Sequence, residues 1–438
     1  MKKILIITYH FPPDSEVGGL RVQKYAKYLP RFNWQPLVLT VKETYYPQKD
    51  YDRMRDVSCE VYRTKMLPGL RDTYLGGKKI AGRLLHPISG STSPVSTESL
   101  VSALEKSEPG LRKFIIDFMW MLDDKTGWIL PAVFHGFRVA RRHSIDTILT
   151  TSPPHSVQIT GLLLKLILRK RWVIDFRDPW SLILGDSIFA RGERRLERLA
   201  MKYADTVCTA TETVRDYLVK THSDVPSDKF VCIPNGFDLE DFRDAKPEKN
   251  GHFVITYIGD LYAGRSPEVY LQAISELIRE KKIDPERIRL KIIGKHIKYV
   301  GNKTIEDLLS SYDLNGLTDM MGAVPYGEAI RQMVSSQILV VLSPQNFVHP
   351  TKTFEYMASD AHILAFTPPG ALADLVRRYP KGHVLSLDDV RGSKAVILEC
   401  YRQHQNGMDS GSVRKIHPSS LLSEYDRKSL TKTLSAYL

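Results

Sequence analysis

The sequence predicts an α/β protein built from two doubly wound halves, each with a parallel sheet covered by helices. The 438 residues suffice for two or three domains with cores of their own. Short β-branched runs that end in polar or proline residues alternate with helical patterns, which is typical of parallel sheets. This alternation stops in the charged stretch 239–252, which we expect to be a linker and the hinge of domain closure, and then begins again. We therefore expect domains over 1–240 and 250–405, and a polar, helical tail over 406–438 that packs back.

The first half begins with a buried strand expected over 3–11, and a glycine pair and a helical pattern follow it. Further strands are expected over 35–41, 144–154, 171–180, 205–212 and 230–238. Residues 81–112 interrupt this order with a stretch rich in Ser, Thr, Pro and Gly. Such a long segment predicts a mobile loop, either a functional lid or a disordered connection.

The second half repeats the same order. Strands expected over 253–262 and 288–294 flank a helix over 266–282, and 317–344 predicts strand, loop, helix and strand. The stretch 349–366, "HPTKTFEYMASDAHILAF", then predicts a polar turn, a helix and a buried strand. A second parallel sheet follows from this pattern.

Composition narrows the functional classes. The four cysteines lie far apart without a Cys-x-x-Cys pair, which argues against a zinc site and a disulfide framework and fits a reducing cytoplasm. The apolar N-terminal run ends at Pro12-Pro13 without a cleavage site, and no stretch has the roughly 18 apolar residues of a membrane span. The net charge of +12 suits nucleic acid, an anionic membrane surface or a phosphorylated substrate.

Ligands of open parallel sheets bind beyond the carboxyl ends of the strands, so the strand-to-loop junctions are the places to search. Gly18 and Gly19 separate the first strand from a helix. Glycines there let the backbone approach a ligand, and the helix amides attract anions. A plain βα turn explains the same pair, and the G-x-G-x-x-G fingerprint is absent.

The segment "DFRDPW" crowds Asp175, Arg177, Asp178 and Trp180 at another strand end. A structural ion-pair cluster is one interpretation. The other is a ligand site, because Pro179 forces the chain out of the strand and should turn Asp178 and Trp180 toward a cleft.

Two segments in the second half predict anion sites. Arg265 precedes a helix marked by Ser266 and Pro267, and a guanidinium beside a helix N-terminus suits a diphosphate. An arginine solvated on a loop is the alternative for this segment.

In the other segment, Pro350 permits a first helical turn in which the amides of Thr351, Lys352 and Thr353 are free. Glu355, one turn further on, suits the vicinal hydroxyls of a ribose; alternatively it only complements the helix dipole.

Together these motifs resemble one family. The Gly-Gly pair, "IPNGFD", "GAVPYGE" and "HPTKTFEYMAS" look like the retaining, nucleotide-sugar-dependent glycosyltransferases of the GT-B fold, family-4 type. "DFRDPW" and "GDLYAGRSPEVYL" look like a branch that acts in bacterial surface-polysaccharide assembly. The resemblance implies two Rossmann-like domains facing a cleft, with the acceptor on the N-terminal side and a UDP- or GDP-linked sugar on the C-terminal side.

The resemblance also implies roles for single residues. Gly18, Gly19 and Gly259 would approach the donor, Val324 would lie near its base, and Thr351 and Thr353 would bind its diphosphate. Arg265 and Lys352 would neutralise the leaving diphosphate, and Glu355 would hold the ribose. Asp178, His10 or His155 would orient the acceptor hydroxyl, Asp178 being preferred, with Arg177 and Trp180 beside it. No metal or cofactor is implied. Two positions depart from the family pattern, where Phe347 and Asp260 replace a glutamate and an arginine.

Basic segments over 138–143, 165–171 and 191–205 gather in the first half. The last carries Leu196, Leu199 and Tyr203 on one helical stripe among arginines, a pattern found on helices that lie on anionic lipid. With the 81–112 loop and the apolar segment 114–122, this predicts peripheral contact with the cytoplasmic face of the inner membrane. A packed helix with a solvated face is the alternative. A lipid-linked saccharide acceptor would explain membrane contact.

Three other functions compete with the transferase. A sugar-nucleotide epimerase would need acids and bases facing the sugar, and Phe347 removes one carboxylate. A degenerate protein that only binds nucleotide fits the two departures. Nucleic-acid binding has only the positive charge in its favour, since no binding motif is present.

Overall fold

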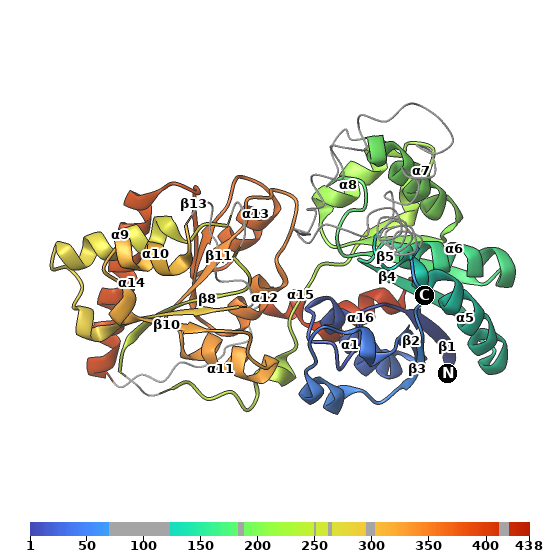
Figure 1. Ribbon diagram of the computed structural model, residues 1–438, viewed down its shortest axis with the longest axis horizontal. Coiled ribbons are helices and arrows are strands. Elements are labelled where there is room, and N and C mark those ends of the chain that lie inside the picture. The colour runs from blue at the N-terminus through green and yellow to red at the C-terminus, as the bar shows by residue number, and fades with distance from the viewer. Residues whose placement is uncertain (70–122, 183–187, 249–250, 262–264, 295–302, 411–419) are drawn as a thin grey trace, which may run out of the picture.

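The computed structural model describes residues 1–69, 123–182, 188–248, 251–261, 265–294, 303–410 and 420–438. Within these residues the chain forms two separate sheets, one in each lobe of Figure 1, and every strand pairs in parallel with its neighbours. Helices cover both faces of each sheet. The predicted α/β class with two doubly wound sheets is confirmed.

The N-terminal sheet has the order β3-β2-β1-β4-β5-β6-β7. Its strands are β1 Lys2–Ile7, β2 Trp34–Val41, β3 Glu60–Thr64, β4 Thr147–Ser152, β5 Arg171–Phe176, β6 Thr206–Thr209 and β7 Phe230–Cys232. Its helices are α1 Gly18–Tyr28, α5 Ile129–His143, α6 Ser156–Leu168, α7 Ile188–Tyr203 and α8 Glu212–Thr221. The central strands are buried on both faces, because their runs of Ile, Leu and Val pack against helices on either side.

The C-terminal sheet has the order β10-β9-β8-β11-β12-β13. Its strands are β8 Phe253–Ile258, β9 Ile288–Ile293, β10 Thr318–Met321, β11 Ile338–Leu342, β12 His362–Phe366 and β13 Gly382–Leu385. Its helices are α9 Glu268–Arg279, α10 Ile305–Ser311, α11 Tyr326–Ser335, α12 Thr351–Ala358, α13 Ala371–Arg377 and α14 Val390–Ser410. Neighbours in chain order lie side by side except where β8 pairs with β11, and ligands bind at such a switch point.

The last residues return to the N-terminal half. Helices α15 Ser420–Tyr425 and α16 Arg427–Ser435 follow the C-terminal sheet, and α16 packs beside α1 (Figure 1). Leu430, Leu434 and Leu438 join the core formed by Ile4, Ile6 and their neighbours. The chain therefore crosses between the two halves a second time.

Three local expectations were wrong. The first strand ends at Ile7 rather than at residue 11, and strands β3 and β13 were not expected at all. Both are edge strands whose residues are mostly half-buried, so they lack the continuous apolar run that marks a central strand. The expected linker also begins with the turn η7 Leu239–Phe242, and Phe242 is buried, so this part of it is packed.

Two further expectations fall on residues that the structure leaves undescribed. The loop 81–112 and the apolar segment 114–122 lie outside the described residues. In the described part of the chain, none of the helices combines the length and the apolar character that crossing a membrane requires.

Candidate functional site

A cavity of about 660 Å³ lies between the two halves, beyond the carboxyl ends of both sheets. Its walls come from three parts of the chain: loops of the N-terminal half, the N-terminal end of α12 with Arg265, and the start of α16. The lining residues with functional groups include His10, Gly18, Arg21, Arg177, Asp178, Arg265, Thr351 and Arg427. Six of these eight were expected from strand-end positions, and Arg21 and Arg427 were not.

The glycine at the start of α1 makes room for an arginine. A Cβ added at Gly18 would collide with the guanidinium of Arg177, whereas one added at Gly19 would meet only ordinary contacts. Gly18 lines the cavity, so the helix N-terminus and the guanidinium reach it together. The absence of a side chain at Gly18 thus leaves room for Arg177, in addition to the close approach to a ligand that the sequence predicts.

Arg177 and Asp178 lie on the N-terminal wall. Arg177 Nε donates to the carbonyl of Ser152 at 3.2 Å, and its Nη2 donates to the carbonyl of Pro153. Burial lowers the pKa of Arg177 and raises the pKa of the Asp178 carboxyl. Burial deprives both charged side chains of water. A polar ligand that forms hydrogen bonds with them would therefore stabilise their charged forms.

His10 completes this wall. Its Nδ1 lies 2.8 Å from Oδ2 of Asp14, a carboxylate that is almost fully buried. The Asp14 carboxylate orients the ring and favours a proton on Nδ1, which leaves Nε2 as the acceptor. His10 can therefore accept a proton or hydrogen bond from a group in the cavity.

Two acceptor-side expectations need correction. Trp180 is 3% exposed and belongs to the core of the N-terminal half, where its ring stacks on His155 with a centroid distance of 5.3 Å. Its backbone amide donates to Glu197, which pulls the residue inward after Pro179. Burial lowers the pKa of His155 to about 3. Neither side chain lines the cavity in the described structure. Both lie behind the residues that form its wall.

The start of α12 carries part of the expected anion site. Thr351 lines the cavity, and within the described residues the amides of Thr351 and Lys352 have no acceptor. The amide of Thr353 was expected to be free and is not, because it donates to the carbonyl of Pro350 at 3.0 Å. Pro350 caps the helix from outside the first turn and so captures the third amide.

Lys352 lies over the end of β8. Its Nζ donates to the carbonyl of Ile258 at 2.7 Å and sits 4.1 Å from the ring centroid of Tyr257. Gly259, with φ +138°, leaves space for it, since an added Cβ would come within 3.0 Å of Nζ. Burial, and then the charge of Arg265, lower the pKa of Lys352 to about 7. Lys352 and Gly259 thus lie behind the cavity wall rather than on it.

Glu355 is buried one turn into α12. It accepts a hydrogen bond from the hydroxyl of Tyr326 at 2.8 Å, and burial raises its pKa to about 7. Tyr326 starts α11, and its amide donates to Asp50 of the N-terminal half at 3.1 Å. A tyrosine hydroxyl therefore takes the place on Glu355 that the sequence assigns to a ribose.

Val324 lines a second cavity, of about 550 Å³, between "GAVP" and the turn η3 Tyr51–Asp56. Asp50 and Arg53 lie on the opposite wall, and Arg53 also stacks over Tyr326 at 5.5 Å. Tyr326 therefore lies between the residues of this second cavity and Glu355. Phe347, one of the two departures, lines the first cavity and offers its carbonyl to Thr211.

Arg427 was not expected, because it comes from the tail after both sheets. It is 2% exposed, and its buried Nη1 has no hydrogen-bond partner among the described residues. Burial and the nearby Arg21 lower its pKa to about 10. No local sequence signal marks it; only the return of α16 to α1 brings it to the cavity.

A glycosyl transferase 4-like domain matches residues 18–236, which is half of the chain. A comparison with curated protein sequences finds no match.

Several solved structures share the fold over the whole chain. HepE from Anabaena, solved in complex with UDP and glucose, has a TM-score of 0.63 at 13% identity, covering 100% of this chain and 99% of its own. A glycosyltransferase from Rickettsia africae gives 0.61 at 14%, covering 100% and 97%. Sucrose-phosphate synthase from Thermosynechococcus elongatus gives 0.58 at 13%, covering 100% and 98%. At these identities the likeness shows the fold, which is that of GT-B glycosyltransferases.

Proposed function

The chain belongs to the glycosyl transferase 4-like family, and from this premise we propose that it moves a sugar from a nucleoside-diphosphate donor to a saccharide or lipid-linked saccharide. The observation that carries the proposal is the cavity between the halves. Arg177, Arg265 and Arg427 reach it from three parts of the chain, and α1 and α12 begin at it. Guanidinium groups and helix N-termini together suit a diphosphate.

The donor diphosphate lies between Arg265, Arg427 and the first amides of α12 in this proposal. As the bond to the sugar breaks, negative charge grows on the leaving diphosphate, and fixed cations in a partly enclosed site stabilise it. Lys352 lies just behind and adds charge when protonated. These side chains supply the positive charge that a metal ion would otherwise bring, so the proposed reaction uses no cofactor.

The nucleoside extends from the diphosphate toward the second cavity. Glu355 accepts hydrogen bonds from the ribose hydroxyls, after the Tyr326 hydroxyl gives up its place, and the backbone around Val324 borders the base. Ribose hydroxyls replace the hydrogen bond that Tyr326 makes, so the buried carboxylate keeps a partner. The complexes of HepE with UDP and with UDP-glucose favour UDP over GDP as the first nucleotide to test.

The acceptor hydroxyl lies toward Asp178, Arg177 and His10. We infer transfer with retention, in which an oxygen of the leaving diphosphate helps to take the acceptor proton while both substrates lie on one face of the sugar. Asp178 orients the hydroxyl by accepting its hydrogen bond. Burial raises the pKa of this carboxyl, because its charged form loses contact with water. A hydrogen bond donated by the acceptor hydroxyl would stabilise that charged form.

An acceptor held at a membrane surface, as in surface-polysaccharide synthesis, would suit the outer face of the N-terminal half. On α5, Leu130, Phe134 and Phe137 are 68%, 56% and 37% exposed, and Arg138 and Arg141 lie over the two phenyl rings. The neighbouring α6 exposes Leu166 and Ile167 by about half. Exposed apolar side chains flanked by arginines suit the surface of an anionic bilayer at the cytoplasmic side.

Calorimetric titration tests the donor site. UDP, GDP and a panel of their sugars are titrated into the wild type and into Glu355→Ala. We expect one nucleotide series to bind, and the variant to lose about tenfold in affinity or more, near 1.4 kcal/mol. Binding that is equal in both proteins would remove Glu355 from the site.

Nuclear magnetic resonance of the tightest-binding donor then separates the functional classes. A transferase releases nucleoside diphosphate, and the new sugar keeps the anomeric configuration of the donor. An epimerase changes the sugar signals while the nucleotide stays attached. A protein that only binds nucleotide leaves the donor intact, whichever acceptor is added.

A further inference from the structure

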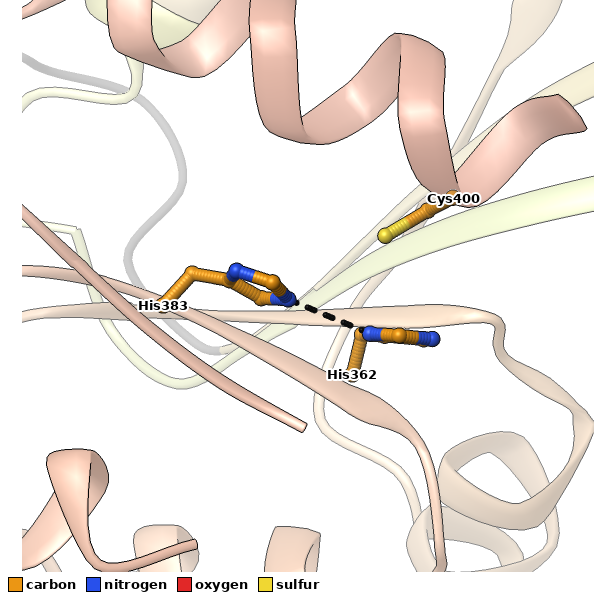
Figure 2. Close-up of side chains that lie close together, drawn as sticks. All are labelled: His362, His383 and Cys400. Carbon is orange, nitrogen blue, oxygen red and sulfur yellow. Dashed lines mark hydrogen bonds between the residues drawn. The ribbon is translucent and has the colours of Figure 1, made fainter. Parts of the chain in front are cut away.

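A second cluster of reactive side chains lies in the C-terminal half, away from both cavities. Nδ1 of His362 and Nε2 of His383 share a hydrogen bond of 3.2 Å, and one ring nitrogen of each histidine and Sγ of Cys400 all lie within 4.8 Å of one another. Figure 2 shows the two imidazoles facing each other, with the sulfur directed toward them from the helix above. Cys400 is 3% exposed, so the cluster is covered on that side.

The fold brings these residues together from three elements. His362 begins β12 and lies on the same face as Leu364 and Phe366, while His383 on the edge strand β13 pairs with Leu364. Cys400 projects from α14, whose Ile397 and Tyr401 pack on that face of the sheet. His362 lies at the amino end of its strand, so the cluster lies at the edge of the sheet opposite the interdomain cavity.

The spacing fits one tetrahedral ion. Two imidazole nitrogens bound to Zn²⁺ at about 2.0–2.1 Å with a tetrahedral angle lie roughly 3.3 Å apart. The observed 3.2 Å between the two nitrogens matches this value. A thiolate at about 2.3 Å from the ion lies roughly 3.6 Å from each nitrogen. Since one ring nitrogen of each histidine lies within 4.8 Å of the sulfur, a small change in the Cys400 rotamer would bring the sulfur to bonding distance of an ion held by the two imidazoles.

The ligand forms of these side chains are the neutral imidazole and the thiolate. An ion bound here would therefore displace the thiol proton of Cys400 and would replace the hydrogen bond between the two imidazoles.

We propose that His362, His383 and Cys400 bind a thiophilic transition-metal ion of the Zn²⁺ type, with the fourth position open to water. The ion ties the edge strand β13 to α14 and so braces the C-terminal half at the edge away from the cavity. Mixed imidazole and thiolate ligands select such ions over Mg²⁺ or Ca²⁺, which prefer oxygen. The spacing of the cysteines in the sequence does not reveal this site, because its ligands come from separate elements.

Metal titration of the whole chain tests this proposal. The purified protein is treated with chelator, exchanged into metal-free buffer and titrated with Co²⁺, followed by absorption and by elemental analysis after Zn²⁺ loading. We expect about one ion per chain and a thiolate-to-cobalt charge-transfer band. One proton released per ion, measured by calorimetry in two buffers, would identify the thiol as a ligand.

Matched variants decide whether these residues hold the ion. Cys400→Ala should abolish the charge-transfer band, and His383→Gln should weaken binding at least tenfold. His404→Gln, one turn further along α14, should bind like the wild type. Melting temperatures measured in chelator establish that each variant folds, and added Zn²⁺ should raise this temperature in the wild type and in His404→Gln alone.

Two results would overturn the proposal. One is a wild type that takes up no ion. The other is an adventitious ion only, held equally well by Cys400→Ala and His383→Gln. Nucleotide binding is measured in chelator on the same samples, so the fate of the metal site and that of the transferase proposal are read separately.

Discussion

Two buried arginines line the same cavity and differ in how completely their N–H groups are satisfied. Arg21 on α1 donates to both oxygens of Asp175, at 3.0 and 2.8 Å, and to oxygens of residues 233–235. These bonds use all five donors of the guanidinium. Arg427 on α16 keeps a buried Nη1 without a partner in the described part of the chain.

The difference extends to the pKa values. Burial alone would lower the pKa of Arg21, but Asp175 raises it above its ordinary value, so the pair behaves as one neutral unit. The pKa of Arg427 falls to about 10, because burial and Arg21 oppose its charge. A satisfied buried arginine holds the fold together, whereas an unsatisfied one leaves positive charge for a ligand. The first is thus predicted to matter for stability and the second for binding.

The largest expected effect is a loss of stability when the satisfied arginine is replaced. Arg21→Met leaves the Asp175 carboxylate buried without its partner, so the free energy of unfolding of the N-terminal half should fall by about 3–5 kcal/mol. Urea denaturation followed by tryptophan fluorescence measures it. The double variant Arg21→Met/Asp175→Leu should recover most of the loss. Removing the exposed pair of Arg198 and Asp224 should change little. Equal losses from both pairs would contradict the distinction.

A second prediction concerns pH. Lys352 and Glu355 both have a pKa of about 7, so affinity for a UDP sugar should peak near pH 7. Below it Glu355 becomes protonated and ceases to accept from the ribose. Above it Lys352 loses the charge that attracts the diphosphate. Each limb should fall by about tenfold per pH unit beyond the pKa.

Calorimetry across pH 5.5–8.5 measures the profile. Glu355→Gln should remove the acidic limb, and Lys352→Arg, which stays charged, should remove the alkaline one. A sugar nucleotide is used because its diphosphate has no terminal phosphate that titrates near pH 6. A flat wild-type profile would show that neither group meets the donor.

The same carboxyl affects stability without ligand. Its folded pKa of about 7 lies above the ordinary value of 4.5, so the folded state binds the Glu355 proton more tightly. The resulting stability is fully present below pH 4.5 and is lost as the pH rises through 7. Glu355→Gln should therefore flatten the fall in melting temperature between pH 5 and 7.5. An identical fall in the variant would assign it to other groups.

A smaller effect is expected at the start of α1. Gly18→Ala places a methyl group against the Arg177 guanidinium, which its bonds to two carbonyls hold in place. Overpacking of this kind costs about 1–3 kcal/mol of stability, and the shift that it forces on the start of α1, which lines the cavity, should lower donor affinity several-fold. Gly19→Ala is the control, since its methyl group fits and alanine favours the helix. Calorimetry and thermal melting of both variants would contradict this account if Gly18→Ala behaved like Gly19→Ala.

The smallest effect is a change of shape. The sequence places a hinge at 239–252, but Asp238 and Asp241 bind Lys24 of α1, so its first residues move with the N-terminal half. We expect closure around the residues after Phe242 when a donor binds, with a small fall in the radius of gyration. Scattering profiles that coincide with and without UDP would exclude closure.

Much of the fold and part of the site were predictable from sequence for one physical reason. Parallel strands end at one edge of a sheet, so residues at strand ends that are distant in sequence gather there, as Gly18 and Asp178 do in the first sheet and Arg265 and Thr351 in the second. The central strands could be recognised in the sequence by their continuous apolar runs. The edge strands β3 and β13 lack such runs, because most of their residues are only half-buried.

The remaining parts of the site depend on tertiary contacts. Trp180 was placed wrongly, because the bond between its amide and buried Glu197 comes from α7, a separate helix. The role of Tyr326 beside Glu355 and the arrival of Arg427 depend on packing between elements far apart in sequence. Local patterns carry no information about such contacts.

The most direct test of the central claim compares UDP with uridine in wild type, Arg427→Gln and the exposed neighbour Lys428→Gln. If the interdomain cavity holds a diphosphate, calorimetry should show UDP binding far more tightly than uridine. Arg427→Gln should lose about tenfold to a hundredfold for UDP alone, near 1.5–3 kcal/mol for a charged hydrogen bond. Lys428→Gln should match the wild type. Equal binding of UDP and uridine, or an unchanged Arg427→Gln, would contradict the account.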